Sequence, residues 1–275
     1  MKISKKLLGL ISVILLTSGL TTFGQKVTPT DISGSDLVER YSDDEKNPFK
    51  SMNGVANSSN SDAPAGSISV NEDPVFNAMT PAQLVQQAFV TGCLQTSNVK
   101  FGYYKKVNNV WTWTNHNWSA TAADRQMGYF TKGTSNFPIS DGIILTTGKA
   151  ASAMGPNSTG NKSDQMVSGA SDPDLVTLSG KSMNDAAVLE FDFVPAGNTM
   201  EFKYMFSSEE YLEYVHTAYN DAFGFFLSGN GISGTFQNNA INLAVLPNGD
   251  PVTINTIHPA GTNIEVTYFR VTHLS

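Results

Sequence analysis

The densest group of side chains that could do chemistry lies between two strongly apolar stretches. It contains three glutamates, an asparagine and an aspartate: Glu209, Glu210, Glu213, Asn220 and Asp221. General acid–base catalysis needs two carboxylates that flank the scissile bond and differ in environment. In an extended chain Glu209 and Glu210 point to opposite sides, whereas a turn or short helix would bring Glu209 and Glu213 to one face. The acidic loop could therefore serve a secreted glycosidase or peptidase, although it matches no catalytic motif.

Calcium is a second use for these oxygen atoms. Ca²⁺ prefers carboxylate, amide and carbonyl oxygens, and extracellular proteins often hold it weakly. Two loops supply candidate ligands: Glu209, Glu210 and Asp221 in the acidic loop, and Asp172 and Asp174 upstream of it. Their spacing matches no EF-hand. The alternative is that each carboxylate caps a turn or accepts backbone N–H groups. Calcium is the one cofactor that the sequence suggests.

A third group consists of aromatic residues around the turn Asn108-Asn109: Tyr103, Trp111, Trp113 and Trp118. If these side chains are exposed on a β-hairpin, they could bind sugar rings or a protein surface. Cross-strand packing within the hairpin is the alternative, and the frequency of aromatic cross-strand pairs favours it.

Other chemistries find no support. The four histidines, His116, His216, His258 and His273, are scattered without ligand spacing or a Ser/His/Asp arrangement. The glycines near residue 229 are not followed by the lysine of a phosphate-binding loop. The chain has 17 basic and 24 acidic residues, a formal net charge of -7. Since nothing in this balance would neutralise phosphates, we expect no nucleic-acid partner.

The elements that must position these residues are β-strands. Two alternating runs joined by a Pro-Ala-Gly-Asn turn at 195–198 precede the acidic loop, and they predict an antiparallel hairpin with one buried face. The predicted buried face carries Leu189, Phe191, Phe193, Met200, Phe202, Tyr204 and Phe206. Residues 221–227 are almost wholly apolar and predict a central strand.

Further patterns complete the fold prediction. Thr80, Pro81 and the apolar residues after them predict a helix over 80–90. Further strands are predicted at 140–148, 241–246, 252–257 and 264–271, and a hairpin at 99–118, with a long loop at 149–181. The fold class is therefore all-β: a jelly-roll-like antiparallel β-sandwich with one short N-terminal helix.

The N-terminus has the organisation of a secretory signal peptide. Basic residues precede an apolar run at 7–20, which is too short for a membrane anchor, and small residues follow it. We predict a signal peptide at 1–24, cleaved between Gly24 and Gln25, and no transmembrane segment in the mature chain. A polar linker follows at 25–78, and the β-sandwich domain occupies 79–275. Cys93 is the sole cysteine and is read as a small apolar residue.

Several segments resemble, in order, the choice-of-anchor L domain of bacterial secreted and surface proteins. They are SDGIILTTG, the GPN and DPDL of the next loop, NDAAVLEFDFVP, FSSEEYLEY, NDAFGFFLSG and NNAINLAVLPNGDPVTINTIH, spread over residues 80–258. The resemblance implies an exported β-rich module without established enzymatic activity. Similar proteins continue beyond this point, so we expect the domain to be truncated at its C-terminus. The aromatic hairpin looks like an insertion.

The expected function is that of an exported extracellular or cell-surface module that binds or adheres without catalysis. Its expected partner is an extracellular glycan or a protein surface. The alternatives are a secreted hydrolase that uses Glu209, Glu210 and Glu213, and a structural module of a surface coat.

Overall fold

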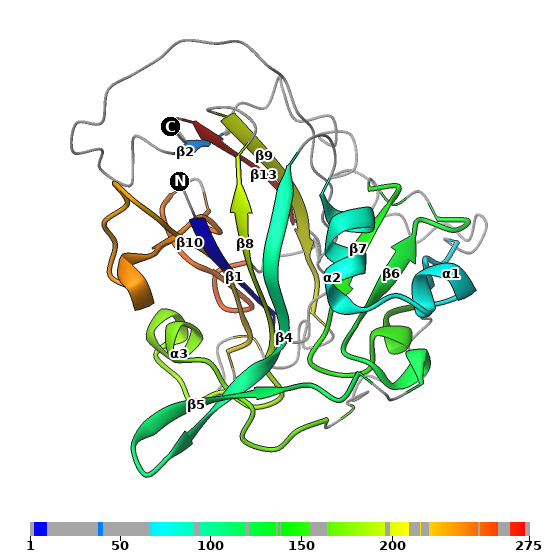
Figure 1. Ribbon diagram of the computed structural model, residues 1–275, viewed down its shortest axis with the longest axis horizontal. Helices are drawn as coiled ribbons and strands as arrows, with labels where there is room; N and C mark the ends of the chain where they lie inside the picture. Colours follow the sequence, from blue (N-terminus) through cyan, green and yellow to red (C-terminus); the bar gives the residue numbers. More distant parts are fainter. Residues whose placement is uncertain are drawn as a thin grey trace.

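The computed structural model describes residues 3–9, 38–40, 66–90, 94–118, 121–135, 137, 139–154, 164, 166–195, 199–208, 215, 220–246, 248–257 and 265–272. Most of the described elements are antiparallel strands arranged in three sheets, with short helices beside them (Figure 1). The protein is thus an all-β antiparallel sandwich, as the sequence predicts.

The largest sheet has seven strands in the order β11–β10–β1–β8–β4–β5, and β12 also pairs with β10. The bounds of its strands are β1 Ile3–Gly9, β4 Gln95–Val107, β5 Val110–Asn115, β8 Ala187–Val194, β10 Ala222–Ser228, β11 Ile241–Asn242 and β12 Val252–Thr253. Strands β4 and β5 form the predicted hairpin, with Val107 paired to Val110 across the turn.

Two smaller sheets complete the architecture. The first, in the order β2–β13–β9, consists of β2 Val38–Arg40, β9 Thr199–Phe206 and β13 Glu265–Thr272. The second, in the order β3–β6–β7, consists of β3 Ser69–Val70, β6 Met127–Thr131 and β7 Asp141–Leu145. Strand β3 lies within the segment predicted as linker and pairs with β6.

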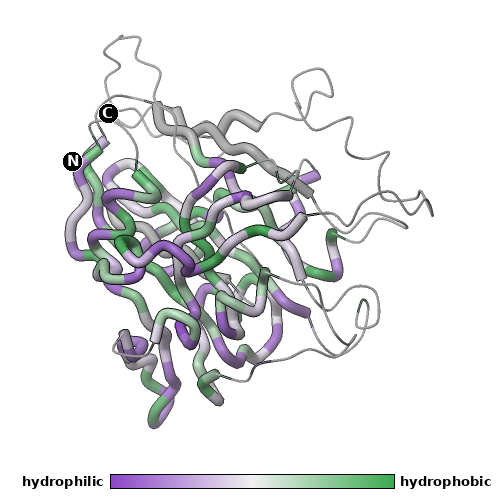
Figure 2. Tube along the Cα trace, turned by 90° about the vertical axis from the view of Figure 1, so that its right-hand side faces the viewer, coloured by the Kyte–Doolittle hydropathy of each residue, from purple (hydrophilic) through white to green (hydrophobic). Residues whose placement is uncertain are grey.

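The main core lies between the large sheet and the two smaller ones. Phe202 on β9 contacts Phe225 on β10 edge to face, with 4.7 Å between ring centroids. The ring of Tyr204 lies 4.8 Å from that of Phe223 in a tilted arrangement, and Phe191 on β8 belongs to the same apolar cluster. Burial of these rings supplies the main driving force for folding. In Figure 2, hydrophobic stretches of the trace run through the middle of the molecule.

The predicted hairpin of the two alternating runs is wrong. Strand β8 pairs with β1 and β4, whereas β9 pairs with β13 in another sheet. The apolar faces of β8 and β9 lie in one core, but they face each other across it. Period-two alternation identifies the buried face of a strand and leaves its hydrogen-bonding neighbour open, which explains the error.

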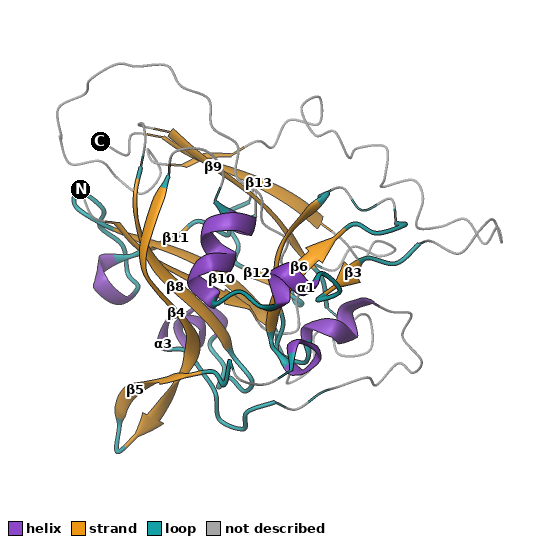
Figure 3. Cartoon of the chain, turned by 45° about the vertical axis from the view of Figure 1, so that its right-hand side comes forward, coloured by secondary structure: helices purple, strands orange, loops and turns teal. Residues whose placement is uncertain are grey.

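Short helices pack beside the sheets. Helix α2 (Pro81–Leu84) continues into a π-helical turn, η2 (Val85–Phe89), and begins with a capping box between Thr80 and Gln83. Its apolar residues enter the core beside β4 (Figure 3). The remaining helical elements are α1 Pro74–Asn77, η3 Ala122–Asp124, η4 Ala150–Met154, α3 Pro173–Ser179 and η5 Gln237–Asn239. Within the described residues, no helix has the length and apolar character needed to span a bilayer.

Strand β1 lies between β8 and β10 and is antiparallel to both (Figure 1). These residues are part of the segment that the sequence predicts to be removed on export. The chain as it stands therefore uses part of its predicted signal peptide as an inner strand. Cleavage after Gly24 stays a prediction.

Candidate binding surface

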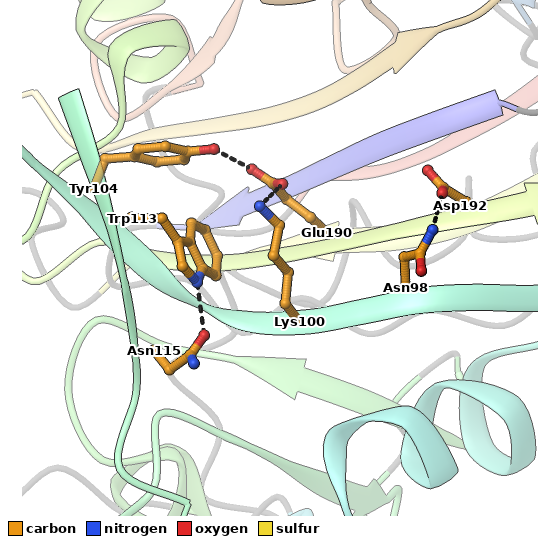
Figure 4. A network of polar contacts seen from close by, with 7 residues as sticks. All are labelled: Asn98, Lys100, Tyr104, Trp113, Asn115, Glu190 and Asp192. Atoms are coloured by element: carbon orange, nitrogen blue, oxygen red, sulfur yellow. Dashed lines mark hydrogen bonds and ion pairs between the residues drawn. The ribbon is translucent and has the colours of Figure 1, made fainter. Parts of the chain in front are cut away.

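One face of β8 points into the core, and the opposite face carries Glu190 and Asp192. Both carboxylates are buried, with 6% and 8% of their residue surface exposed. They are held by side chains of the neighbouring strand β4, namely Asn98, Lys100 and Tyr104 (Figure 4). A buried charge is tolerated only with such partners.

A β-bulge positions the first of these partners. The register between β4 and β8 shifts between Ser97 and Lys100, and Asn98 has φ of 52° in the left-handed region. Asparagine tolerates this conformation better than most residues. The Asn98 amide Nδ2 then donates to Asp192 Oδ2 over 2.5 Å. The extra residue thus re-aims one side chain at a buried carboxylate, which is a common use of bulges.

Glu190 is held from two sides. Lys100 Nζ lies 2.7 Å from its Oε2, and the Tyr104 hydroxyl donates to its Oε1 over 3.0 Å. The lysine side chain is 40% exposed, so its charge faces both solvent and the buried carboxylate. The lysine also lies over the Trp113 ring, with Nζ 4.2 Å from the ring centroid. Ion pairing and a cation–π contact therefore share one ammonium group.

The same pattern continues along the hairpin. The register pairs Tyr104 with Trp113 and Lys106 with Trp111, which places these four side chains and Lys100 on one face of the hairpin. Lys106 Nζ lies 5.7 Å from the Trp111 ring centroid, and Tyr104 contacts Trp113 edge to face. We name these five residues, Lys100, Tyr104, Lys106, Trp111 and Trp113, the lysine–aromatic stripe.

Gly102 leaves room for the stripe. A Cβ atom at this position would lie 2.7 Å from Cζ2 of Trp113 and 2.2 Å from the Thr114 carbonyl oxygen. Both distances are below van der Waals contact. The indole of Trp113 lies against the β4 backbone at this point, and its Nε1 donates to Asn115 Oδ1 over 2.6 Å. A glycine is therefore required for this ring position.

The hairpin projects beyond the rest of the large sheet (Figures 1 and 3). Asn108 and Asn109 form its turn with φ of 50° and 63°, the combination that a two-residue type I′ turn requires. Val107 and Val110 flank the turn and are 53% and 63% exposed. The stripe thus ends at an apolar tip that is open to solvent.

The four predicted aromatic residues do not form one patch. Trp111 and Trp113 lie in the stripe, whereas Tyr103 is on the other face and is buried rather than exposed. Trp118 packs against the core, and its Nε1 donates to the Met79 carbonyl over 2.9 Å. Tyr103 and Trp118 are therefore packing residues, which is the alternative that the sequence left open. A binding role of Trp111 and Trp113 stays a prediction.

His116 shares the second face with Tyr103. Its ring lies 4.6 Å from that of Phe101 and 4.9 Å from that of Tyr103, and its Nε2 is 3.3 Å from the Ala186 carbonyl oxygen. Burial among these rings disfavours the imidazolium and lowers the pKa of His116 to about 4, against a smaller opposing effect of the Ala186 carbonyl. The imidazole is therefore neutral at physiological pH.

The aspartates predicted as calcium ligands in the long loop have other roles here. Asp172 is the N-cap of α3 and its Oδ1 accepts the backbone N–H groups of Asp174 and Leu175. Asp174 Oδ1 accepts the backbone N–H of Gln237 over 2.8 Å. Both carboxylates are buried. These contacts match the alternative of capping and backbone hydrogen bonding.

The acidic loop gives less information. Glu209, Glu210 and Glu213 lie outside the described residues. Asp221 is buried immediately before β10, and Asn220 Oδ1 accepts the backbone N–H of Asn255. In the part of the chain that the structure describes, no group of three or more His, Cys, Asp or Glu side chains could hold a metal ion. Calcium binding stays a prediction of the sequence.

The sequence alone indicates Trp111 and Trp113 as candidate binding residues, but it does not indicate the other members of the stripe, Lys100, Tyr104 and Lys106. A two-residue loop at Asn108-Asn109 already implies the pairing of Lys106 with Trp111, so the hairpin register was the available signal. The contact of Lys100 with Glu190 required knowledge that β4 pairs with β8, and no local pattern contains it.

The fold and the surface together define a class of protein. It is an all-β antiparallel sandwich module that displays a hairpin with alternating cationic and aromatic side chains on one face. No curated protein and no solved structure matches the chain.

The family model of the choice-of-anchor L domain matches residues 69–273, about three quarters of the chain. The chain belongs to the choice-of-anchor L domain family and is a surface-associated module. The match begins ten residues before the predicted domain start at 79 and includes β3 and α1.

Proposed function

We propose that this chain is an exported, non-catalytic binding module that holds an acidic extracellular polysaccharide on its lysine–aromatic stripe. The observation that carries the proposal is the register of the hairpin, which sets Lys106 beside Trp111 and Lys100 beside Trp113 on one face. An indole face suits the C–H face of a sugar ring, and an ammonium group suits the carboxylate of a uronic acid.

The arrangement also favours binding without turnover. Glu190, a carboxylate that contacts the stripe, is buried and held by both Lys100 and Tyr104. Glycoside hydrolysis needs a second carboxylate at a distance of roughly 5–10 Å, placed on the other side of the scissile bond. The predicted hydrolytic residues Glu209, Glu210 and Glu213 belong to a different segment from the stripe.

The experiment measures binding to polygalacturonate, an acidic polymer, and to dextran, a neutral one, by affinity electrophoresis. We expect retardation by polygalacturonate only. Trp111→Ala should weaken it about tenfold, since loss of one aromatic contact costs about 1.4 kcal/mol. Lys106→Gln should weaken it less and reduce its dependence on salt. Lys132→Gln is the matched control, because Lys132 is exposed in the loop after β6.

Other results would overturn parts of the proposal. Equal binding of both polymers, or equal loss in Lys132→Gln and Lys106→Gln, would remove the stripe as the acidic-glycan site. Binding to immobilised extracellular protein with no binding to either polymer would make the partner a protein surface. Release of new reducing ends from polygalacturonate would identify a hydrolase instead of a binding module.

A further inference from the structure

Strand β1 occupies a position in the large sheet between β8 and β10, and neither of these two strands could take its place. Each is antiparallel to β1, so the two run in the same direction on either side of it. The outer neighbours of both are already in place: β4 pairs with β8, and β11 and β12 pair with β10. We name this position, between Ala187–Phe193 and Gly224–Ser228, the strand slot.

The strand slot cannot close by a small movement. Adjacent strands lie about 4.8 Å apart, so two strands that share a neighbour are separated by roughly 9.6 Å. Closing that distance would have to create a parallel pair and shift the rings that β8 and β10 place in the core. An empty slot would also leave backbone N–H and C=O groups of two buried strands without partners, which is costly.

We propose that, once residues 1–24 are removed on export, the strand slot binds an extended segment of another polypeptide by β-strand addition. The proposal does not depend on the polysaccharide proposed above. Each strand that the structure describes already pairs within its own sheet, so any of these strands in a second copy would have to unpair before it could be donated. A foreign strand carries no such cost.

The two rows of the slot define the chemistry of that segment. One row runs past core residues: β1 places Leu7 across from Leu189 and Phe225, and Lys5 across from Phe191 and Leu227. This row requires apolar residues. The other row runs past Glu190 and Asp192 on β8 and past Phe226 and Ser228 on β10. A lysine or arginine suits the position between Glu190 and Phe226, because its stem is apolar and its head is charged, and a basic or hydroxyl residue suits the position between Asp192 and Ser228.

The native β1 sequence meets these requirements in part. Lys6 has the register position next to Glu190, which satisfies the acidic row. Lys5 has a position in the apolar row, where lysine is a costly residue. A strand with an apolar residue at that position should therefore bind more tightly than β1 and displace it. Because of Lys5, the strand β1 that fills the slot before cleavage can be exchanged for a better-matched strand.

The first experiment uses residues 25–275 with Cys93→Ala and a fluorescent peptide of residues 2–10, KISKKLLGL. We expect saturable binding by fluorescence anisotropy and protection of β8 and β10 amides in hydrogen exchange. The peptide with Lys5→Val should bind at least tenfold more tightly. A peptide with Leu7→Pro should not bind, because proline lacks the N–H group that pairs with a neighbouring strand.

Cross-linking tests the register. The structure pairs Ser4 with Ser228, and directly opposed residues are close enough for a disulfide. A peptide with Ser4→Cys should therefore cross-link to the chain with Cys93→Ala and Ser228→Cys. The matched control is Ser179→Cys at the end of α3, which should remain uncoupled.

A second design covers the case in which residues 25–275 do not fold alone. The full chain receives a protease site within residues 57–62, is folded with β1 in place and is then cut. The Lys5→Val peptide should release the N-terminal fragment, and a scrambled peptide should not.

Three results would overturn the proposal. One is a cut chain that neither holds its fragment nor binds the peptide while β8 and β10 amides stay protected, because the slot would then have closed on itself. Another is equal affinity for the Lys5→Val and Leu7→Pro peptides. The third is a stable dimer of residues 25–275 with protected slot amides, since the second copy would then be the donor.

Discussion

The two faces of β8 are both buried, yet they are stabilised in different ways. On the core face, Leu189, Phe191 and Phe193 pack among other apolar side chains with almost no exposed surface. On the opposite face, Glu190 and Asp192 are also buried, but each depends on a particular side chain of β4. Burial of a strand face therefore does not require that the face be apolar.

The two faces of β8 differ in how readily one contacting side chain can be replaced by another. An apolar row gains free energy from the area it buries, whichever apolar group covers it. A buried carboxylate loses free energy unless one donor stands at one position, so it also selects the register of the neighbouring strand. The bulge at Ser97–Lys100 brings donors to both carboxylates. We infer that the core face sets the stability of the large sheet and that the polar face sets the register of β4.

The largest expected effect comes from the core face. Phe202→Ala removes a ring that contacts both Phe89 and Phe225, and it should lower the free energy of unfolding by about 3–5 kcal/mol. Urea denaturation measures this loss. Lys203→Ala, next along β9, is the control and should cost within about 0.5 kcal/mol. Equal losses at the two positions would show that β9 does not present one face to the core.

The β4–β5 hairpin also has two different faces, and the pH dependence of stability tests the buried one. Its inner face holds His116 neutral, with a pKa of about 4 against 6.5 for the free side chain. Below pH 6.5 the histidine is protonated in the unfolded chain but stays neutral in the folded chain. The contribution of His116 to the free energy of unfolding is therefore fully present above pH 6.5 and is lost as the pH falls to about 4. The full loss is about 3 kcal/mol from this shift.

Urea denaturation between pH 7 and pH 4 measures the loss, and His116→Gln is the reference that lacks the titrating group. The difference between the two proteins separates His116 from the carboxylates, which also titrate near pH 4. If both proteins lose stability equally over this range, the imidazole is as hydrated in the folded chain as in the unfolded one.

The hairpin also shows what a sequence can predict. Asn108-Asn109 between two aromatic runs predicts the turn and the pairing of β4 with β5, because a two-residue loop fixes both. The alternation in β8 and β9 likewise predicts their core faces. It does not predict that the two strands belong to different sheets, because that choice depends on contacts between residues far apart in sequence.

Helix α3 lies within the segment 149–181 that the sequence predicts as a long loop, although the local signals of a helix are present. Asp172 is its N-cap, Pro173 begins it and Gly180 ends it with φ of 66°. The sequence predicts Asp172 as a calcium ligand or a turn cap, and an aspartate that caps a helix is compatible with the same local pattern. In the candidate site, the missing information is not local. Trp111 and Trp113 are visible in the sequence, but the contact between Lys100 and Glu190 arises only when β4 and β8 pair.

The smallest expected effect, on the polar face, tests the distinction most directly. Lys100→Met keeps the length of the side chain and removes the charge that lies 2.7 Å from Glu190. Of the contacts that β4 makes with this carboxylate, the hydrogen bond from Tyr104 is then left. Loss of the partner of a fully buried charge costs about 3–5 kcal/mol, and because Lys100 is 40% exposed we expect a smaller loss of about 1–3 kcal/mol.

A double-mutant cycle with Glu190→Gln isolates the pair, since Lys100→Met should cost much less when position 190 carries no charge. Lys105→Met is the matched control, because Lys105 lies on the other face of β4 near Tyr103. It should show no coupling to Glu190→Gln. If Lys100 and Lys105 couple equally to position 190, the acidic face responds to the general charge of the hairpin, and selection of the β4 register must come from the apolar contacts alone.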